Sequence, residues 1–236
     1  MTHRKLLKTA GIVATFTAIL AAGMMNSSKR VRAHDDEGDD DREEWRIHRG
    51  LAIAPVPLHF DEEDKNLVGL GSYFVNAVVD CNGCHSAGPP TYYIRGGNPY
   101  FLSPPFTGKI KINPATYLAG GRDFGPVGSV LHLYSRNLTP DKTGRPEGGH
   151  SFEEFLQIMR QGTDFDHVHP NCSSPGTPAN CFEPPFNGDV LQVMPWPILQ
   201  NMSDHDLKAI YKYLNALQCN PAPVIEGAPY LQNTCS

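Results

Sequence analysis

Beyond its first 33 residues the sequence has little positive charge. Six of its 20 basic residues lie in that stretch and all 25 acidic residues follow it, so residues 34–236 carry a net charge of −11. Nucleic-acid binding depends on basic side chains that neutralise phosphates, so the composition disfavours nucleic acid as a partner. Eight acids and one arginine fall within residues 35–44. We expect residues 34–60 to form a solvated acidic leader and linker that is partly disordered.

Long apolar runs are also scarce, and the single candidate lies at the N-terminus. Arg4, Lys5 and Lys8 precede an apolar stretch over residues 10–25, and small residues near Ala33 provide a cleavage site. This pattern predicts a signal peptide over residues 1–33 and export to the periplasm or beyond the cell. With cleavage, no other segment is apolar enough to span a membrane. The alternative is an uncleaved tether, since the stretch of about 16 residues is near the short limit for spanning a bilayer.

Regular periodicity is confined to three stretches. Apolar residues recur at three- and four-residue steps over residues 62–81, 152–162 and 203–217, whereas residues 86–136 and 163–193 show no sustained period. The 22 glycines and 21 prolines are typical of long irregular connections. The sequence therefore predicts an all-α domain of about three to four helices over residues 61–236, with long Pro/Gly-rich loops.

Local signals mark the ends of these helices. Asp61 can cap the first helix, Ser151 begins a capping box that precedes the second helix, and Ser203 caps the third. Gly162 can end the second helix. The first helix contains Gly69 and Gly71, which cost helix stability unless another helix approaches closely, and Tyr213 and Leu214 of the last helix could cross there.

Aromatic residues concentrate in the first aperiodic stretch. We expect an ordered loop layer that buries these rings and packs over the functional site, because no acid, base and nucleophile cluster in it. The rings belong to Tyr92, Tyr93, Tyr100, Phe101, Phe106, Tyr117, Phe124 and Tyr134.

Cysteines are few, and two of the six form a distinctive motif. Cys81-Asn82-Gly83-Cys84-His85 has the C-x-x-C-H spacing of covalent haem attachment, in which both thiols bond the porphyrin and the histidine binds the iron. A zinc ribbon would need a second C-x-x-C, and a thioredoxin-like motif would need a βαβ pattern. The motif occurs once, which predicts one covalent haem c held by Cys81 and Cys84, with His85 as the proximal iron ligand.

The other four cysteines predict structural disulfides in an oxidising compartment. Cys172 and Cys181 flank a short Ser/Pro/Gly/Asn loop, while Cys219 ends a helical pattern and Cys235 lies in the tail. These positions favour Cys172–Cys181 and Cys219–Cys235, although four cysteines allow three pairings.

Met194 is the strongest candidate for the distal iron ligand. It lies in Val193-Met194-Pro195-Trp196-Pro197, where proline restricts the backbone and can aim the thioether at the iron. Met159 falls on an apolar helical stripe and Met202 at a helix start, so both are better explained by packing. Four histidines are the remaining rivals, and lone histidines are mostly structural. They are His132, His150, His167 and His169.

These stretches together resemble the class I cytochrome c superfamily. They look most like the single-haem domains in the cytochrome c subunits of periplasmic alcohol and sugar dehydrogenases. The similar segments are residues 71–77 with 80–85, 120–122, 137–144, 152–162, 194–196 and 203–214. The resemblance implies a small α-helical fold around haem, proximal His85 and distal Met194. It also implies that residues 137–141 pack beside the haem.

The function we expect is single-electron transfer between redox proteins such as a periplasmic dehydrogenase or a terminal oxidase, with no catalytic residues of the chain's own. One alternative is a haem enzyme or gas sensor with an open iron position. Another is an electron-transfer subunit fixed in a dehydrogenase or respiratory complex. The oligomeric state and the donor and acceptor are left open by the sequence.

Overall fold

The computed structural model describes residues 40–87, 91–102, 106–174, 180–221, 225–226, 233 and 235. The chain divides into two compact units, residues 1–45 and 46–236. In the first unit the described residues, 40–45, are helical. The predicted signal peptide over residues 1–33 and the start of the acidic leader, residues 34–39, lie outside the described residues.

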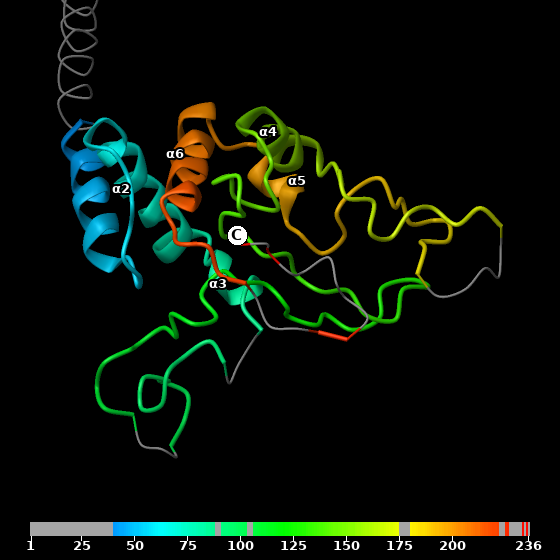
Figure 1. The fold of residues 1–236 in the computed structure, drawn as a ribbon, viewed down its shortest axis with the longest axis horizontal. Coiled ribbons are helices and arrows are strands. Elements are labelled where there is room, and N and C mark those ends of the chain that lie inside the picture. The colour runs from blue at the N-terminus through cyan, green and yellow to red at the C-terminus, as the bar shows by residue number, and fades with distance from the viewer. Residues whose placement is uncertain are drawn as a thin grey trace, which may run out of the picture. The chain divides into compact units, whose positions relative to one another are not determined.

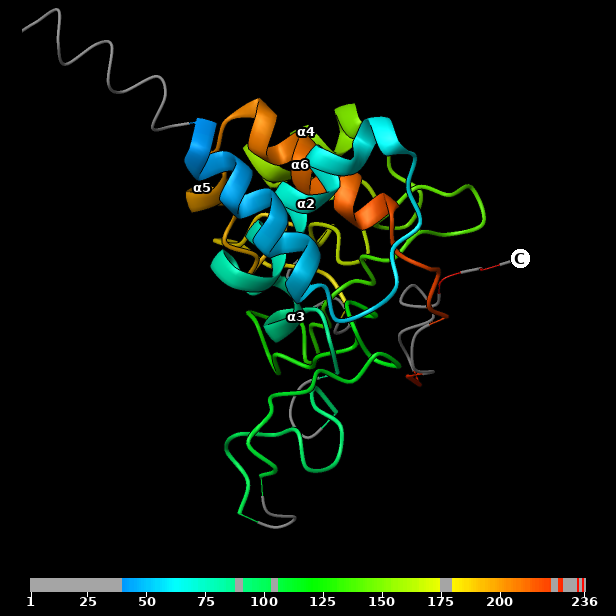
Figure 2. The same cartoon turned by 90° about the vertical axis from the view of Figure 1, so that its left-hand side faces the viewer.

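Helices are the regular elements of the second unit (Figure 1). Extended segments of the described chain meet only in isolated β-bridges, so no sheet forms there. The predicted all-α class is therefore confirmed. Figure 2 shows α2, α4 and α6 gathered on one side of this unit and irregular loops on the other. Among the residues that the structure describes, every helix is too short or too polar to cross a lipid bilayer.

The first predicted helix is built from three consecutive segments. A 3-10 turn, η1 (Glu62–Asp64), leads into α2 (Lys65–Tyr73), and a π-helical segment, η2 (Phe74–Val78), follows. Asp61 precedes the first turn, but its side chain makes no capping hydrogen bond, so that part of the prediction is wrong.

Helix α2 is packed by backbone approach on two sides. A Cβ atom on Gly71 would lie 1.9 Å from the Ala209 carbonyl oxygen of α6 (Asp204–Asn215), and one on Gly69 would lie 2.7 Å from the Ile47 carbonyl oxygen. Both glycines therefore serve the close helix approach that the sequence predicts. The Ser72 hydroxyl donates to the Gly50 carbonyl at 2.7 Å, and this hydrogen bond joins α2 to the segment that contains Ile47.

The leader and linker expected over residues 34–60 is only partly irregular, because residues 46–53 are helical. This helix brings Gly50 to the face of α2 that carries Gly69, where a Cβ on Gly50 would meet the Gly69 oxygen at 1.9 Å. The periodicity of so short a segment is weak, and its docking depends on glycines in two distant segments. The sequence pattern alone therefore missed it.

The remaining predicted helix ends are confirmed. Helix α4 (Phe152–Gln161) begins with the reciprocal Ser151–Glu154 capping box and ends at Gly162, whose φ of 72° suits glycine. Ser203 caps α6 by accepting from the Asp206 N–H. A further single turn, α5 (Trp196–Leu199), was not predicted, since one turn leaves no periodic signal.

Both favoured disulfides are present. Cys172–Cys181 closes a loop, and Cys219–Cys235 ties the tail. The loop layer over residues 86–136 is aperiodic, as expected, but it does not bury all its rings. Tyr117 is 2% exposed, whereas Tyr100 is 82% exposed and Phe101 and Phe106 are also exposed.

Candidate cofactor site

The C-x-x-C-H motif folds into a single helical turn, α3 (Cys81–Cys84), which the Asp80 side chain caps at its N-terminus. Asp80 adopts a left-handed φ of 53° and its carboxylate accepts from the Gly83 N–H at 3.2 Å. A Cβ on Gly83 would lie 2.5 Å from that carboxylate, so a larger residue there would displace the Asp80 side chain from its capping position. Neither cysteine of the motif is in a disulfide, and Cys81 is partly buried whereas Cys84 is exposed.

The protonation state of Cys81 argues against dithiol redox chemistry. Burial, followed by the Asp80 charge, raises the pKa of the Cys81 thiol to about 12. Reactive C-x-x-C cysteines need a lowered pKa, because the thiolate is the nucleophile. This thiol stays neutral near pH 7, which disfavours Cys81 as the nucleophile of a disulfide exchange.

His85 is fixed in one tautomer by the loop that faces it. Its Nδ1 lies 2.8 Å from the Arg136 carbonyl oxygen, which can only accept, so Nδ1 carries the proton and Nε2 is left as a lone-pair donor. Burial lowers the pKa of this imidazole, which favours its neutral form. A neutral imidazole with its second nitrogen held by a backbone carbonyl is the form that binds metals.

The segment 118–122 joins the motif to the loop layer through its backbone. The Leu118 N–H donates to the Asn82 side chain at 2.8 Å, and the Gly120 N–H donates to the His85 carbonyl at 2.8 Å. The Arg122 guanidinium donates to the Gly83 carbonyl. Three residues of the motif are thus bonded to one loop, which holds α3 against the layer.

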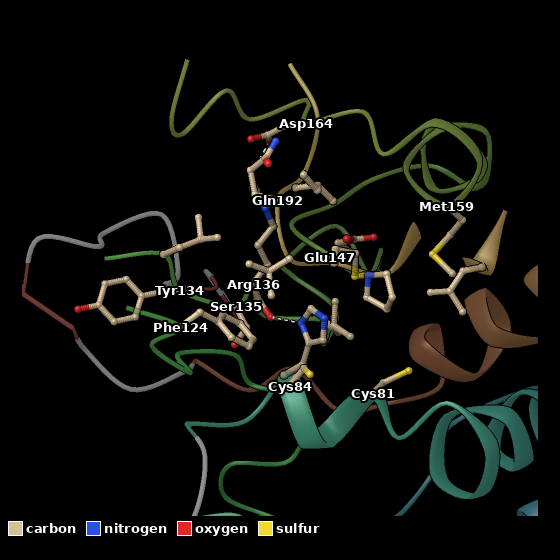
Figure 3. Close-up of a pocket in the computed structure, with 18 of the residues that line it drawn as sticks. Cys81, Cys84, Phe124, Tyr134, Ser135, Arg136, Glu147, Met159, Asp164 and Gln192 are labelled. Carbon is tan, nitrogen blue, oxygen red and sulfur yellow. Dashed lines mark hydrogen bonds and ion pairs between the residues drawn. The ribbon is translucent and has the colours of Figure 1, made fainter. Parts of the chain in front are cut away.

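A cavity opens in front of α3 (Figure 3). The space in front of α3 amounts to about 1230 Å³ when its solvent-open mouth is included. Cys81 and Cys84 project from α3 on one side, and Glu147 and Arg136 lie across from them. Its walls are mainly apolar and come from the loops and from α4, α5 and α6. They include Phe124, Leu138, Phe155, Leu199, Ile210 and Leu214.

All four residues that the sequence predicts for haem binding line this cavity: Cys81, Cys84, His85 and Met194. Of the rivals, Met159 and His169 also line it, although Met159 is 5% exposed and belongs to the core, as predicted. Met202 packs against the core, and it is not a lining residue. Leu138 is the lining residue contributed by the segment 137–141.

Three charged lining residues escaped the sequence analysis: Arg136, Glu147 and Asp164. The Arg136 guanidinium pairs with Asp164 at 2.5 Å and with Asp166, so the residue whose carbonyl holds His85 is clamped to the loop after α4. The Arg136 side chain is 18% exposed and that of Asp164 is 9% exposed. Single charged residues in aperiodic loops carry no pattern, so only their tertiary partners reveal them.

Glu147 is the most unusual of these groups. It is 6% exposed, and its Oε2 has no hydrogen-bond partner among the described residues. Burial raises the pKa of its carboxyl to about 7, with Arg136 opposing the shift and Asp164 adding to it. A buried carboxyl oxygen without a partner on a cavity wall indicates that a polar group of a ligand binds beside it. With the thiol pair, the neutral imidazole and the apolar walls, it fits a haem whose edge carries polar substituents.

No family model matches the chain. It is 30% identical over 170 residues to the gluconate 2-dehydrogenase cytochrome c subunit of Pantoea cypripedii, covering 69% of this chain and 27% of that protein. It is 25% identical over 176 residues to the cytochrome c subunit of the quinone alcohol dehydrogenase of Gluconobacter oxydans strain 621H, covering 72% of this chain and 26% of that protein. The chain is thus distantly similar to cytochrome c subunits of dehydrogenases, and it spans about a quarter of the length of these curated relatives.

Proposed function

We propose that this chain is a monohaem c-type cytochrome that carries single electrons outside the cytoplasm. One haem would be attached through Cys81 and Cys84, with His85 and Met194 as axial ligands. The observation that carries the proposal is the convergence of these four residues, which span 114 sequence positions, on one apolar cavity. When bound, the haem would supply an iron that cycles between its ferric and ferrous states.

Residues around the cavity would orient the axial ligands and exclude water from the site. The Arg136 carbonyl orients the His85 ring and makes Nε2 more basic, which strengthens it as a ligand. Met194 offers a neutral sulfur, and the pairing of methionine with histidine raises the reduction potential. The apolar walls exclude water, so little solvent has to reorganise when charge changes in the cavity.

The similarity to dehydrogenase cytochrome c subunits supports a carrier without catalytic residues of its own. We propose redox proteins as partners, among them a periplasmic dehydrogenase or a terminal oxidase. We propose further that residues 1–33 direct export and that residues 61–236 form the haem domain. Export agrees with the two disulfides, which persist in oxidising compartments.

Absorption spectra of the exported protein test the proposal. We expect a low-spin spectrum that changes on reduction, a pigment that resists extraction by acidified organic solvent, and the weak near-infrared band of sulfur-to-iron ligation. Met194→Ala should abolish this band, whereas Met202→Ala, outside the cavity, should keep it. Colourless protein would refute haem binding, and a high-spin ferric spectrum with fast ligand binding would favour an open iron position.

A further inference from the structure

An irregular arm projects from the loop layer. Its described residues are 91–102 and 106–113, and in Figures 1 and 2 its ribbon runs from the α3 side away from α4, α5 and α6. The two sides of its stem are bonded to each other. The Ile94 N–H donates to the Lys111 carbonyl at 3.1 Å, and the Lys111 N–H donates to the Gly97 carbonyl at 3.2 Å. The arm is therefore a built structure with an ordered stem.

The arm exposes apolar side chains that a folded protein would ordinarily bury. Leu102 is 95% exposed and Tyr100 is 82% exposed. Six of the twelve exposed large apolar side chains in the described part of the chain lie on this arm, so the exposure is concentrated in one place. They are Ile94, Tyr100, Phe101, Leu102, Phe106 and Ile110. Such a concentration marks an interaction surface.

Basic residues stand behind this apolar tip. Arg95, Lys109 and Lys111 are exposed and lie on the stem. The sequence has no aspartate or glutamate from residue 81 to residue 122, although the whole chain is acidic. The arm thus combines an apolar tip with a positive collar and carries no acidic residue.

We propose that the arm docks on anionic phospholipid membranes. Tyr100, Phe101 and Leu102 would enter the headgroup region, and the basic collar would meet the lipid phosphates. Interfacial anchors combine aromatic and aliphatic side chains with lysine and arginine in this way. The tip is a protrusion, which a fluid bilayer can accept without a complementary hollow, whereas a protein partner would have to supply one.

The root of the arm is bonded to the turn that lines the cavity, so docking of the arm would also position the cavity. The Tyr92 hydroxyl donates to the Asp80 carboxylate at 2.9 Å, and the same carboxylate caps α3. The stem is therefore bonded to the turn that carries Cys81 and Cys84. A docked arm would tether this turn to the bilayer, where membrane-bound redox proteins lie, a consequence that rests on the proposed function.

Sedimentation with vesicles tests the proposal on the exported full chain. Wild-type protein should sediment with vesicles of phosphatidylcholine and phosphatidylglycerol in equal amounts, and much less with phosphatidylcholine alone. Leu102→Asp should weaken binding at least about tenfold, because it removes an apolar side chain from the interface. Lys109→Glu combined with Lys111→Glu should weaken it by about tenfold or more.

Matched controls make the result specific to the arm. Ile198→Asp on α5, at a side chain that is 74% exposed, and Lys208→Glu on α6 should bind like the wild type. The proposal is overturned if wild-type protein ignores anionic vesicles, as it would if a protein were the true occupant. It is also overturned if Leu102→Asp binds as well as Ile198→Asp. The assay does not depend on haem, so its failure is separate from failure of the proposed function.

Discussion

The cavity is enclosed by two regions that are stabilised in different ways. On the helical side α6, which lines the cavity, touches α2 through backbone atoms, at a crossing where Gly71 leaves no room for a side chain. On the other side the loops have no regular hydrogen-bond pattern, and side chains such as that of Arg136 join them. The comparison teaches that steric fit sets the helical wall, whereas charge pairing and hydrogen bonding set the loop wall. A substitution should therefore act through volume in the first region and through lost partners in the second.

The loop wall should show the largest loss. Arg136→Gln removes the partner of Asp164, a carboxylate that is 9% exposed, and should lower the free energy of unfolding by about 3–5 kcal/mol. Denaturant titration measures the change. Arg160→Gln is the control, since Arg160 pairs with Asp204, whose side chain is 79% exposed, and should cost about 1 kcal/mol or less. Equal losses in the two variants would refute the role of the Arg136 clamp.

The helical wall should respond to a single methyl group. In Gly71→Ala the new Cβ would overlap the Ala209 carbonyl oxygen, so α2 and α6 must separate, at a cost of about 3 kcal/mol. Asn66→Ala, at an exposed position of the same helix, should change stability little or raise it slightly. Thermal and denaturant unfolding compare the two. A stable Gly71→Ala protein would show that the crossing is looser than its backbone contact indicates.

The contribution of Glu147, on the loop wall, to the free energy of unfolding should depend on pH. The pKa of Glu147 is raised to about 7 by burial, so the folded state binds its proton more tightly than the unfolded state, where the pKa is near 4.5. The stability that comes from the protonated Glu147 carboxyl is fully present below about pH 4.5 and is lost as the pH rises through 7. Glu147→Gln should therefore gain up to about 3 kcal/mol relative to wild type between these pH values.

Unfolding free energies measured from pH 4 to pH 8 test this dependence. Exposed Glu63→Gln serves as the control and should run parallel to wild type across the range. If Glu147→Gln also runs parallel to wild type, Glu147 titrates normally and the cavity wall is more polar than its burial indicates.

The smallest effect is expected where the two regions meet. The Tyr117 hydroxyl of the loop layer donates to the side-chain Oδ1 of Asn76, on η2, at 2.6 Å and lies 2.7 Å from the Tyr213 hydroxyl of α6. Tyr117→Phe should cost about 1–2 kcal/mol, because it leaves buried polar atoms short of a partner. Tyr100→Phe, at an exposed ring, should cost almost nothing. Equal values for the two variants would mean that this junction contributes no stability.

Several elements could be predicted because their causes are local. The Ser151–Glu154 box and the Ser203 cap depend on residues three positions apart, and Gly162 ends α4 through its own backbone freedom. The C-x-x-C-H spacing likewise brings two thiols and an imidazole onto one turn. The predicted cap at Asp61 was wrong, because its side chain makes no capping hydrogen bond, and the helix over residues 46–53, which depends on docking to α2, was missed.

By itself, then, the sequence determined the helical class, the caps at Ser151 and Ser203, the C-x-x-C-H turn and the cysteines available for bridges, all through interactions of short range along the chain. Only the tertiary structure decided that Arg136 supplies the carbonyl that orients His85, 51 residues earlier, and that Glu147 is buried while Tyr100 is exposed. The physical reason is that burial and pairing depend on which distant segments pack together. A charged or aromatic residue in an aperiodic loop carries no local signal of its eventual neighbours.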